Sequence, residues 1–328
     1  MAAFCNLSRN TRTVMRIATL LAALTCAASS GQAQEAAGKS GSVAATRPPP
    51  AGSDLAYGAF QRGYYMTAMR EALKRLEAGS RDAAAMTLVG LLYHDGLGVR
   101  RDPVEAAKWY RLAADNNNRE AAFALGLMHI QAEGIPLDAK AGAVLFEAAA
   151  AQGHAGALYN LGIMAMEDQG KPPDFARAVQ LFEQAAAAGD PDAMYALGIL
   201  YREGRGVAAD PAKSTQWFSQ AAWLDHLPGM VDYAIALFNG TGITRNETTA
   251  ARLFLKAAAR NNPVAQNRMA RLLATGHGMP RNLVEAMKWH LLARAAGLND
   301  EWLDSQMTTL TAAEQTATEA AVRAYVGK

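Results

Sequence analysis

The sequence has only two cysteines among its 328 residues, Cys5 and Cys26, and both lie within the first 33 positions. A chain that has lost this segment has no disulfide, no thiolate metal site and no cysteine nucleophile. An excess of one charge is also missing: 32 basic residues face 30 acidic ones, which gives no support to nucleic-acid binding. With 51% hydrophobic and 19% charged residues, the composition excludes a disordered chain and a membrane-embedded helix bundle.

The first 33 residues have the pattern of a cleaved secretory signal peptide. Three arginines and no acid precede a run of about a dozen apolar residues at 17–28, and small residues follow up to Ala33. The run is shorter than the roughly 20 residues that a membrane-spanning helix needs. A soluble N-terminal helix is the alternative reading of the segment. We expect export with cleavage after Ala33, and a mature protein that is periplasmic or secreted and has no stable membrane span.

Residues 34–53 form a segment rich in glycine, serine, alanine and proline. Such a segment has few apolar side chains to bury, so it cannot offset the entropy lost on ordering. We expect a disordered linker here.

A period of 36 residues fills most of the remaining chain. One column of this period is glycine six times over, and another holds large apolar residues. The glycines are Gly98, Gly134, Gly170, Gly206, Gly242 and Gly278, and the large residues are Trp109, Leu145, Leu181, Trp217, Leu253 and Trp289. A fixed period of this length indicates one supersecondary element pair copied six times.

Each copy is expected to contain two helices, here called helix A and helix B. Ala85, Val89 and Leu92 follow one face of helix A in the first copy. The glycine at position 98 and its equivalents is expected to close helix A in a left-handed conformation. Asp102 is expected to cap helix B through its side-chain oxygen, and Asp or Asn recurs at this place in all six copies.

One such helix pair cannot bury its apolar face alone, so the copies are expected to stack. The predicted fold is all-α, a right-handed-type α-solenoid superhelix of stacked antiparallel helix pairs. The predicted organisation is a capping helix pair at 54–81, six repeats at 82–297 and capping helices at 298–328. Thr311 and Glu314 have the spacing of a capping box that opens a final helix.

The repeat pattern is similar to the Sel1-like repeat, a relative of the tetratricopeptide repeat. The clearest copy spans 193–222 and contains Leu197, Gly198, Tyr201, Gly204, Gly206, Val207, Asp210, Trp217, Ala221 and Ala222. The resemblance covers about 82–297. It implies an all-α superhelix that binds proteins, often as an adaptor in signalling or envelope processes.

A narrower resemblance concerns function. The leader, the absence of cysteine after it, and the segment 286–297 look like periplasmic Sel1-like regulators of exopolysaccharide synthesis. This resemblance implies restraint of a membrane sensor kinase from the periplasmic side. Some secreted relatives with cysteine pairs in each repeat are associated with penicillin binding, but this chain has no such pairs and no Ser-x-x-Lys motif.

No pattern of catalytic, cofactor-binding or metal-ligating residues stands out. The six histidines lack the spacing of metal ligands, and we expect His129 and His290 to be packing variants within aromatic columns. The glycine pair Gly96 and Gly98 lacks both the following lysine and the preceding strand of a phosphate-binding loop. The chain is therefore not expected to be an enzyme or to need a cofactor.

Helix A offers the candidate surface for a partner, because one stripe opposite its apolar face varies between copies. A neighbouring column is aromatic in three consecutive copies. The candidate partner-binding residues are Phe123, Tyr159, Asn160, Glu167, Tyr195, Glu203, Asp232 and Arg268. Tyrosine and arginine dominate many protein interfaces. The alternatives left open are that the charges are ordinary solvated surface and that the aromatic rings pack between copies.

The predicted function is that of an exported, non-catalytic protein-interaction scaffold. Its partner would lie in the concave groove of the solenoid, and the periplasmic domain of a membrane sensor is one such partner. An envelope carbohydrate-binding scaffold that stacks sugars on the aromatic rings is the alternative. A β-lactam- or peptidoglycan-acting enzyme is a further alternative, supported by family analogy alone.

Overall fold

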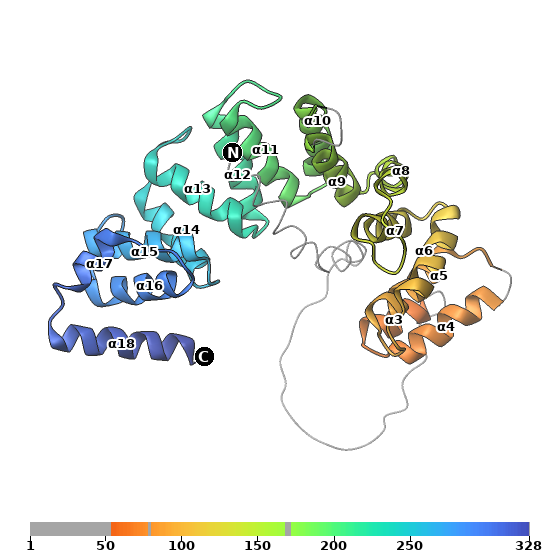
Figure 1. Cartoon of the computed structure of the whole chain (residues 1–328), viewed down its shortest axis with the longest axis horizontal. Coiled ribbons are helices and arrows are strands. Elements are labelled where there is room, and N and C mark those ends of the chain that lie inside the picture. Colours follow the sequence, from red (N-terminus) through yellow and green to blue (C-terminus); the bar gives the residue numbers. More distant parts are fainter. Residues whose placement is uncertain (1–53, 78–79, 168–171, 328) are drawn as a thin grey trace, which may run out of the picture. The chain divides into compact units, whose positions relative to one another are not determined.

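The computed structural model describes residues 54–77, 80–167 and 172–327. All regular secondary structure in this part of the chain is helical. It contains sixteen helices and no strand within those ranges (Figure 1). The all-α fold of repeated helix pairs predicted from the 36-residue period is therefore confirmed. The expected signal peptide and linker lie outside the described residues.

The chain divides into two compact halves, Met1–Leu158 and Tyr159–Lys328, with the boundary inside α9 (Ala155–Met166). The other helices of the N-terminal half are α3 (Leu55–Gln61), α4 (Tyr65–Glu77), α5 (Ala83–Asp95), α6 (Pro103–Asp115), α7 (Arg119–Gln131) and α8 (Ala139–Ala150). Those of the C-terminal half are α10 (Phe175–Ala187), α11 (Pro191–Glu203), α12 (Pro211–Trp223), α13 (Leu227–Asn239), α14 (Glu247–Ala258), α15 (Pro263–Thr275), α16 (Leu283–Ala295), α17 (Glu301–Met307) and α18 (Ala312–Val326).

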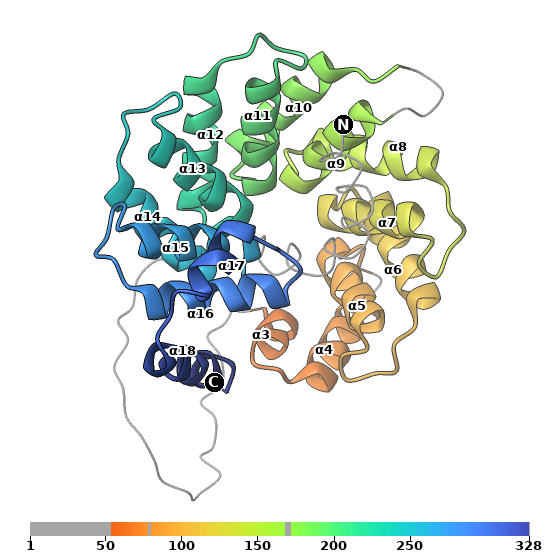
Figure 2. The same cartoon turned by 60° about the vertical axis from the view of Figure 1, so that its left-hand side comes forward.

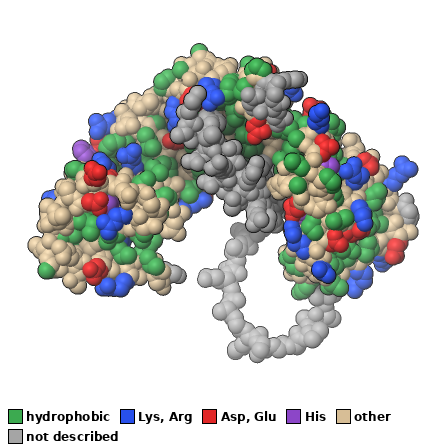
Figure 3. All heavy atoms as spheres, viewed as in Figure 1, with side chains coloured by type: hydrophobic (Ala, Val, Ile, Leu, Met, Phe, Trp, Pro, Cys, Tyr) green, Lys and Arg blue, Asp and Glu red, His purple; other side chains and the backbone are tan. Residues whose placement is uncertain are grey.

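Within each half, the helices pack mainly on their neighbours in the chain. Figures 1 and 2 show α4, α5 and α6 side by side in one half, and α11, α12 and α13 in the other. At the C-terminal end, α18 packs on α16. Contacts limited to chain neighbours are typical of α-solenoids, in which each helix pair is stabilised by the pair before and after it. Figure 3 shows acidic and basic side chains interspersed on the face in view.

Capping side chains determine where the helices begin. Every helix B starts at the Asp or Asn predicted from the sequence, and the side chain accepts a backbone N–H of the first turn. The caps are Asp102, Asp138, Asp174, Asp210, Asn246 and Asn282. The capping box of Thr311 and Glu314 at the start of α18 is also present.

The glycine column at position 98 has a different role from the expected one. Helix A is closed two residues earlier, by left-handed residues such as Gly96 and Gly204, so the prediction that the 98 column ends the helix is wrong. Gly98 and its described equivalents do have positive φ. Their distinctive contact is with the first turn of the preceding helix B: a Cβ on Gly134 would lie 2.6 Å from the carbonyl carbon of Pro103. The column therefore sets how closely consecutive repeats approach, and Gly170 lies outside the described residues.

A second glycine column sets how closely the two helices of one repeat approach. A Cβ on Gly126 would lie 2.7 Å from the ring of Phe146, and one on Gly198 would lie 2.5 Å from Cδ1 of Phe218. Real Cβ atoms essentially never come this close to another heavy atom. The aromatic residue of helix B thus fills the space that the missing Cβ leaves, and it is almost fully buried. This aromatic column comprises Tyr110, Phe146, Phe182, Phe218 and Phe254, followed by His290.

Gly198→Ala should lower the free energy of unfolding by about 1–3 kcal/mol, because the new methyl group overlaps the ring of Phe218. Shortening that ring in the double variant Gly198→Ala, Phe218→Leu should recover part of the loss. Urea denaturation followed by far-UV circular dichroism measures both.

Gly58 in α3 is the matched control, because the nearest atoms to a Cβ there belong to the flexible side chain of Arg62, 3.6 Å away. Gly58→Ala should stabilise the chain by roughly 0.5–1 kcal/mol through helix propensity. Equal stabilisation by Gly198→Ala would contradict the proposed role of the column.

Candidate protein-interaction surface

The aromatic column of helix A comprises Phe123, Tyr159 and Tyr195. Its rings pack between consecutive repeats, and their exposure differs from repeat to repeat. In the N-terminal half, Phe123 is only 4% exposed. Its ring lies 4.2 Å from that of His154 and 5.7 Å from that of Phe146, measured between centroids. Phe123 therefore contributes to packing and presents almost nothing to a partner. The alternative left open by the sequence, that these aromatic rings pack between copies, holds for this residue.

Tyr159 and Tyr195 are half-buried in the C-terminal half. Each ring tilts against the helix B aromatic residue of its own repeat, with centroids 5.6 Å apart in the pairs with Phe182 and Phe218. Tyr195 also lies 5.0 Å from the ring of His226. These contacts hold both rings in place, and each residue keeps part of its surface in solvent.

The hydroxyl groups of both tyrosines lie among carboxylates. Burial, reinforced by the nearby carboxylates of Asp192 and Asp190, raises the pKa of Tyr159. Burial likewise raises the pKa of Tyr195, and the nearby Asp232 carboxylate of the next helix A acts in the same direction. Both tyrosines thus remain neutral hydrogen-bond donors at physiological pH.

Asp232 joins Tyr195 to a cation. Its carboxylate lies 3.5 Å from the guanidinium of Arg202, which in turn lies 5.4 Å from the centroid of the Phe218 ring. Burial raises the pKa of Asp232, while the charge of Arg202 and the hydroxyl of Tyr195 act in the opposite direction. The arrangement fixes one tyrosine, one acid and one arginine on two adjacent helices.

The remaining candidates have different surroundings. Asn160 is buried, with 7% of its surface exposed, which leaves little for a partner to touch. Glu167, Glu203 and Arg268 are exposed, and Glu203 lies 3.5 Å from Arg205. The structure therefore brings Tyr195 and Asp232 together and places Arg268 on the solvent side of α15.

Sequence reasoning missed a second column of helix caps, at the start of helix A. Two of its members are histidines: Nδ1 of His154 accepts the N–H of Ala157, and Nδ1 of His226 accepts that of Gly229. Nε2 of each ring lies about 3 Å from a carboxylate of the preceding helix A, Glu120 Oε2 in one case and Asp192 Oδ1 in the other. The signal was present, because the same register holds Asp82, Asn118, Asp190 and Asn262.

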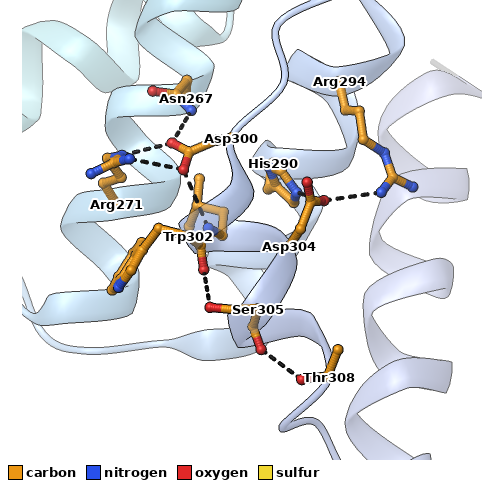
Figure 4. A network of polar contacts seen from close by, with 10 residues as sticks. Asn267, Arg271, His290, Arg294, Asp300, Trp302, Asp304, Ser305 and Thr308 are labelled. Atoms are coloured by element: carbon orange, nitrogen blue, oxygen red, sulfur yellow. Dashed lines mark hydrogen bonds and ion pairs between the residues drawn. The ribbon is translucent and has the colours of Figure 1, made fainter.

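Near the C-terminus, the column of Phe123, Tyr159 and Tyr195 has polar contacts in place of aromatic ones. Asn267 occupies the position of Tyr195 and donates to Asp300 at 2.7 Å, and Arg271 donates to both oxygens of that carboxylate at 2.6 and 2.8 Å (Figure 4). Burial acts against ionisation, but these hydrogen bonds outweigh it and lower the pKa of Asp300 to about 2. The acid also caps α17.

His290 and His129 are buried, as the aromatic-column interpretation predicted. Nε2 of His290 lies 2.8 Å from Asp304, which also accepts from Arg294 at 3.1 Å (Figure 4). The described residues contain no group of three or more His, Cys, Asp or Glu side chains placed to hold a metal ion. None of the described helices has the length and apolarity needed to cross a membrane.

The chain belongs to the Sel1 repeat family. The family pattern matches six consecutive stretches, at residues 83–118, 119–154, 155–190, 191–226, 227–262 and 263–298. A search of curated proteins gives no match. Sel1-repeat proteins typically act as protein-interaction scaffolds, and the fold is generally non-catalytic.

Solved structures show the same fold. A Sel1 repeat protein from Oxalobacter formigenes is 29% identical, with a TM-score of 0.67 over 74% of this chain and 98% of that one. A protective antigen of uropathogenic Escherichia coli with an SLR fold is 24% identical, with a TM-score of 0.54 over 80% of this chain and 64% of that one. The second likeness concerns the fold alone.

Asp300→Asn should lower the free energy of unfolding by about 2 kcal/mol at pH 7, since the ion pair with Arg271 is lost. The folded pKa is depressed below the ordinary 3.8, so this stability is present above that value and is lost as the pH falls towards 2. Denaturation at a series of pH values should show wild type and variant converging over this window.

Asp115→Asn is the control, because Asp115 is exposed on α6. It should change stability by less than about 0.5 kcal/mol at every pH. A constant gap between wild type and Asp300→Asn down to pH 2 would contradict the proposed ionisation.

Proposed function

We propose that this chain is an exported, non-catalytic scaffold that binds a protein partner through the helix A surface around Tyr195. The observation that supports this most is the cluster of Tyr195, Asp232 and Arg202 on adjacent helices A, with Arg268 exposed on the next one. Tyrosine and arginine are enriched among the residues that contribute most to protein interfaces. The family membership supports a protein as the partner.

Pre-organisation supports the same surface. The ring of Tyr195 is held between Phe218 and His226, so little side-chain entropy remains to be lost on binding. The side chains of Arg202 and Asp232 are 47% and 20% exposed. A half-buried aromatic residue flanked by one acid and one base favours a protein segment with both apolar and charged side chains.

The geometry gives less support to carbohydrate binding. Sugars stack on open aromatic faces, whereas the rings of Tyr159 and Tyr195 pack against Phe182 and Phe218. Both tyrosines are also half-buried. The protein-binding proposal is therefore preferred over the carbohydrate-binding one.

We further propose that the protein acts in the periplasm, where it regulates an envelope sensor kinase or exopolysaccharide synthesis. The basic and apolar order of residues 1–33 supports export. The resemblance of the leader and of segment 286–297 to periplasmic regulators supports the regulatory role. The partner would then be the periplasmic domain of a membrane sensor.

A photo-crosslinking amino acid at position 195 or 159 should capture a protein partner in living cells. The same amino acid at Val144 on α8, which is 63% exposed, should give much less product. Tyr195→Phe together with Arg268→Glu should weaken binding to the captured partner by about tenfold or more while leaving the circular dichroism spectrum unchanged. Equal crosslinking from positions 195 and 144, or unchanged binding by this double variant, would assign binding to another surface.

Export predicts a shortened N-terminus. Mass spectrometry of the protein from osmotically released periplasm should find a chain that begins at Gln34 or close to it, and Arg12→Glu with Arg16→Glu should retain the protein in the cytoplasm. A full-length chain confined to the cytoplasmic fraction would contradict the proposed location.

A further inference from the structure

The end of α12, in repeat 191–226, has an exposed tryptophan that packing does not explain. Trp223 leaves 85% of its surface in solvent, the largest fraction among the exposed large hydrophobic residues of the described chain. The same register position holds small residues or an acid in the other copies: Asp115, Ala151, Ala187, Ala259 and Ala295. The helix pair thus needs no large side chain here, and the ring contributes little to folding because it stays in water.

The turn that follows Trp223 has the same left-handed residue as its counterparts. Asp225 has a φ of 61°, and Asn117, Gly153, Gly189, Asn261 and Gly297 also have positive φ at this register position. Asp and Asn are the non-glycine residues that adopt this conformation most readily. The Asp225 carboxylate binds Lys256 at 2.8 Å and Arg260 at 3.0 Å, and Arg260 also donates to the Asp225 carbonyl. These contacts fix the turn against the C-terminal end of α14.

The surroundings of the ring are apolar and basic. Leu224, next to the tryptophan, is 49% exposed, and Leu255 on α14 is 43% exposed. Arg252, Lys256 and Arg260 are all exposed and follow one another at intervals of four. Arg252 and Lys256 share one face of α14, and Arg260 lies in the turn that follows this helix. Asp225, the acid among them, already has two cationic partners and presents no free negative charge.

We propose that this edge, defined by Trp223, Leu224, Leu255, Arg252, Lys256 and Arg260, docks on an anionic lipid surface. Tryptophan partitions to the interface of a bilayer, where its apolar ring is buried and its N–H stays hydrated. Lysine and arginine beside it are attracted to anionic headgroups. The positive charge of Arg252, Lys256 and Arg260 is thus complementary to such a surface.

A bilayer suits this edge better than a protein does. A stable protein interface buries about 800 Å² on each partner around a close-packed centre. Here one ring projects from the end of α12, and the equivalent residues of the other repeats are mostly alanines. A rigid partner would need a cavity that matches the ring, whereas lipid headgroups adapt to it. This surface shares no residue with the helix A cluster around Tyr195, so the inference goes beyond the proposed function and does not depend on it.

The test uses the protein purified in its native processed form and vesicles of phosphatidylglycerol mixed with phosphatidylcholine. The wild type should float with these vesicles, should bind pure phosphatidylcholine vesicles much less, and should be released by salt. Brominated lipid should quench part of its tryptophan fluorescence. Trp223→Ala should weaken binding by about tenfold or more and remove that quenching.

Two further variants separate the contributions. Arg252→Glu should weaken binding to the anionic vesicles severalfold, because Arg252 is outside the Asp225 ion pairs and its loss leaves the turn intact. Val144→Ala, an exposed apolar residue of the other half, should leave vesicle binding unchanged. Failure of the wild type to float, equal binding by Trp223→Ala, or crosslinking of position 223 to a protein in the absence of lipid would each overturn the proposal.

Discussion

The fold depends on how closely its helices can approach one another. Two columns of glycine set these distances, one at the helix A and helix B contact within a repeat, and one at the contact between a loop and the preceding helix B. At both places a side chain would overlap a ring or a backbone carbonyl. Packing density in protein interiors leaves little room to absorb such an overlap, so each glycine sets the approach in the repeat that contains it. The column within a repeat comprises Gly90, Gly126, Gly162 and Gly198 and continues as Ala234 and Ala270.

This constraint also explains which positions are free to vary. Where the repeats contact one another, the space available to each side chain determines which residues the small and aromatic columns can hold. The N-cap of helix A needs only a side-chain acceptor, so Asp, Asn and His all serve there, and the histidines add a bond to the preceding repeat. Positions with no packing requirement, such as 223, accept a tryptophan without cost to the fold. The proposed lipid-binding edge uses a position of this kind.

Much of the fold follows from the sequence because the same residue pattern recurs in six copies. The period predicts helix pairs, and the Asp or Asn column predicts where each helix B begins, as the structure confirms at Asp102 and its equivalents. The role of Gly98 could not be predicted in the same way. Its contact is with residues from the preceding repeat, and only the three-dimensional stack shows which residues these are.

The candidate site was harder to predict for the same reason. Periodicity places Phe123, Tyr159 and Tyr195 in one column, but it does not show that Phe123 is buried while the two tyrosines are only half-buried. Tyr195 and Asp232 lie in different repeats, so neither residue alone indicates that they approach one another. Trp223 departs from its column in the sequence, but only its exposure shows that the departure serves no packing purpose.

Native-state hydrogen exchange on Gly242→Ala tests the account most directly. A Cβ at this position overlaps the carbonyl of Pro211, the first residue of α12, and Gly242 itself lies between α13 and α14. If small-residue contacts fix each repeat against the one before it, amide protection should fall most in α12, α13 and α14 and less in α16 and α18. Unchanged protection, or an equal loss in every helix, would contradict the account.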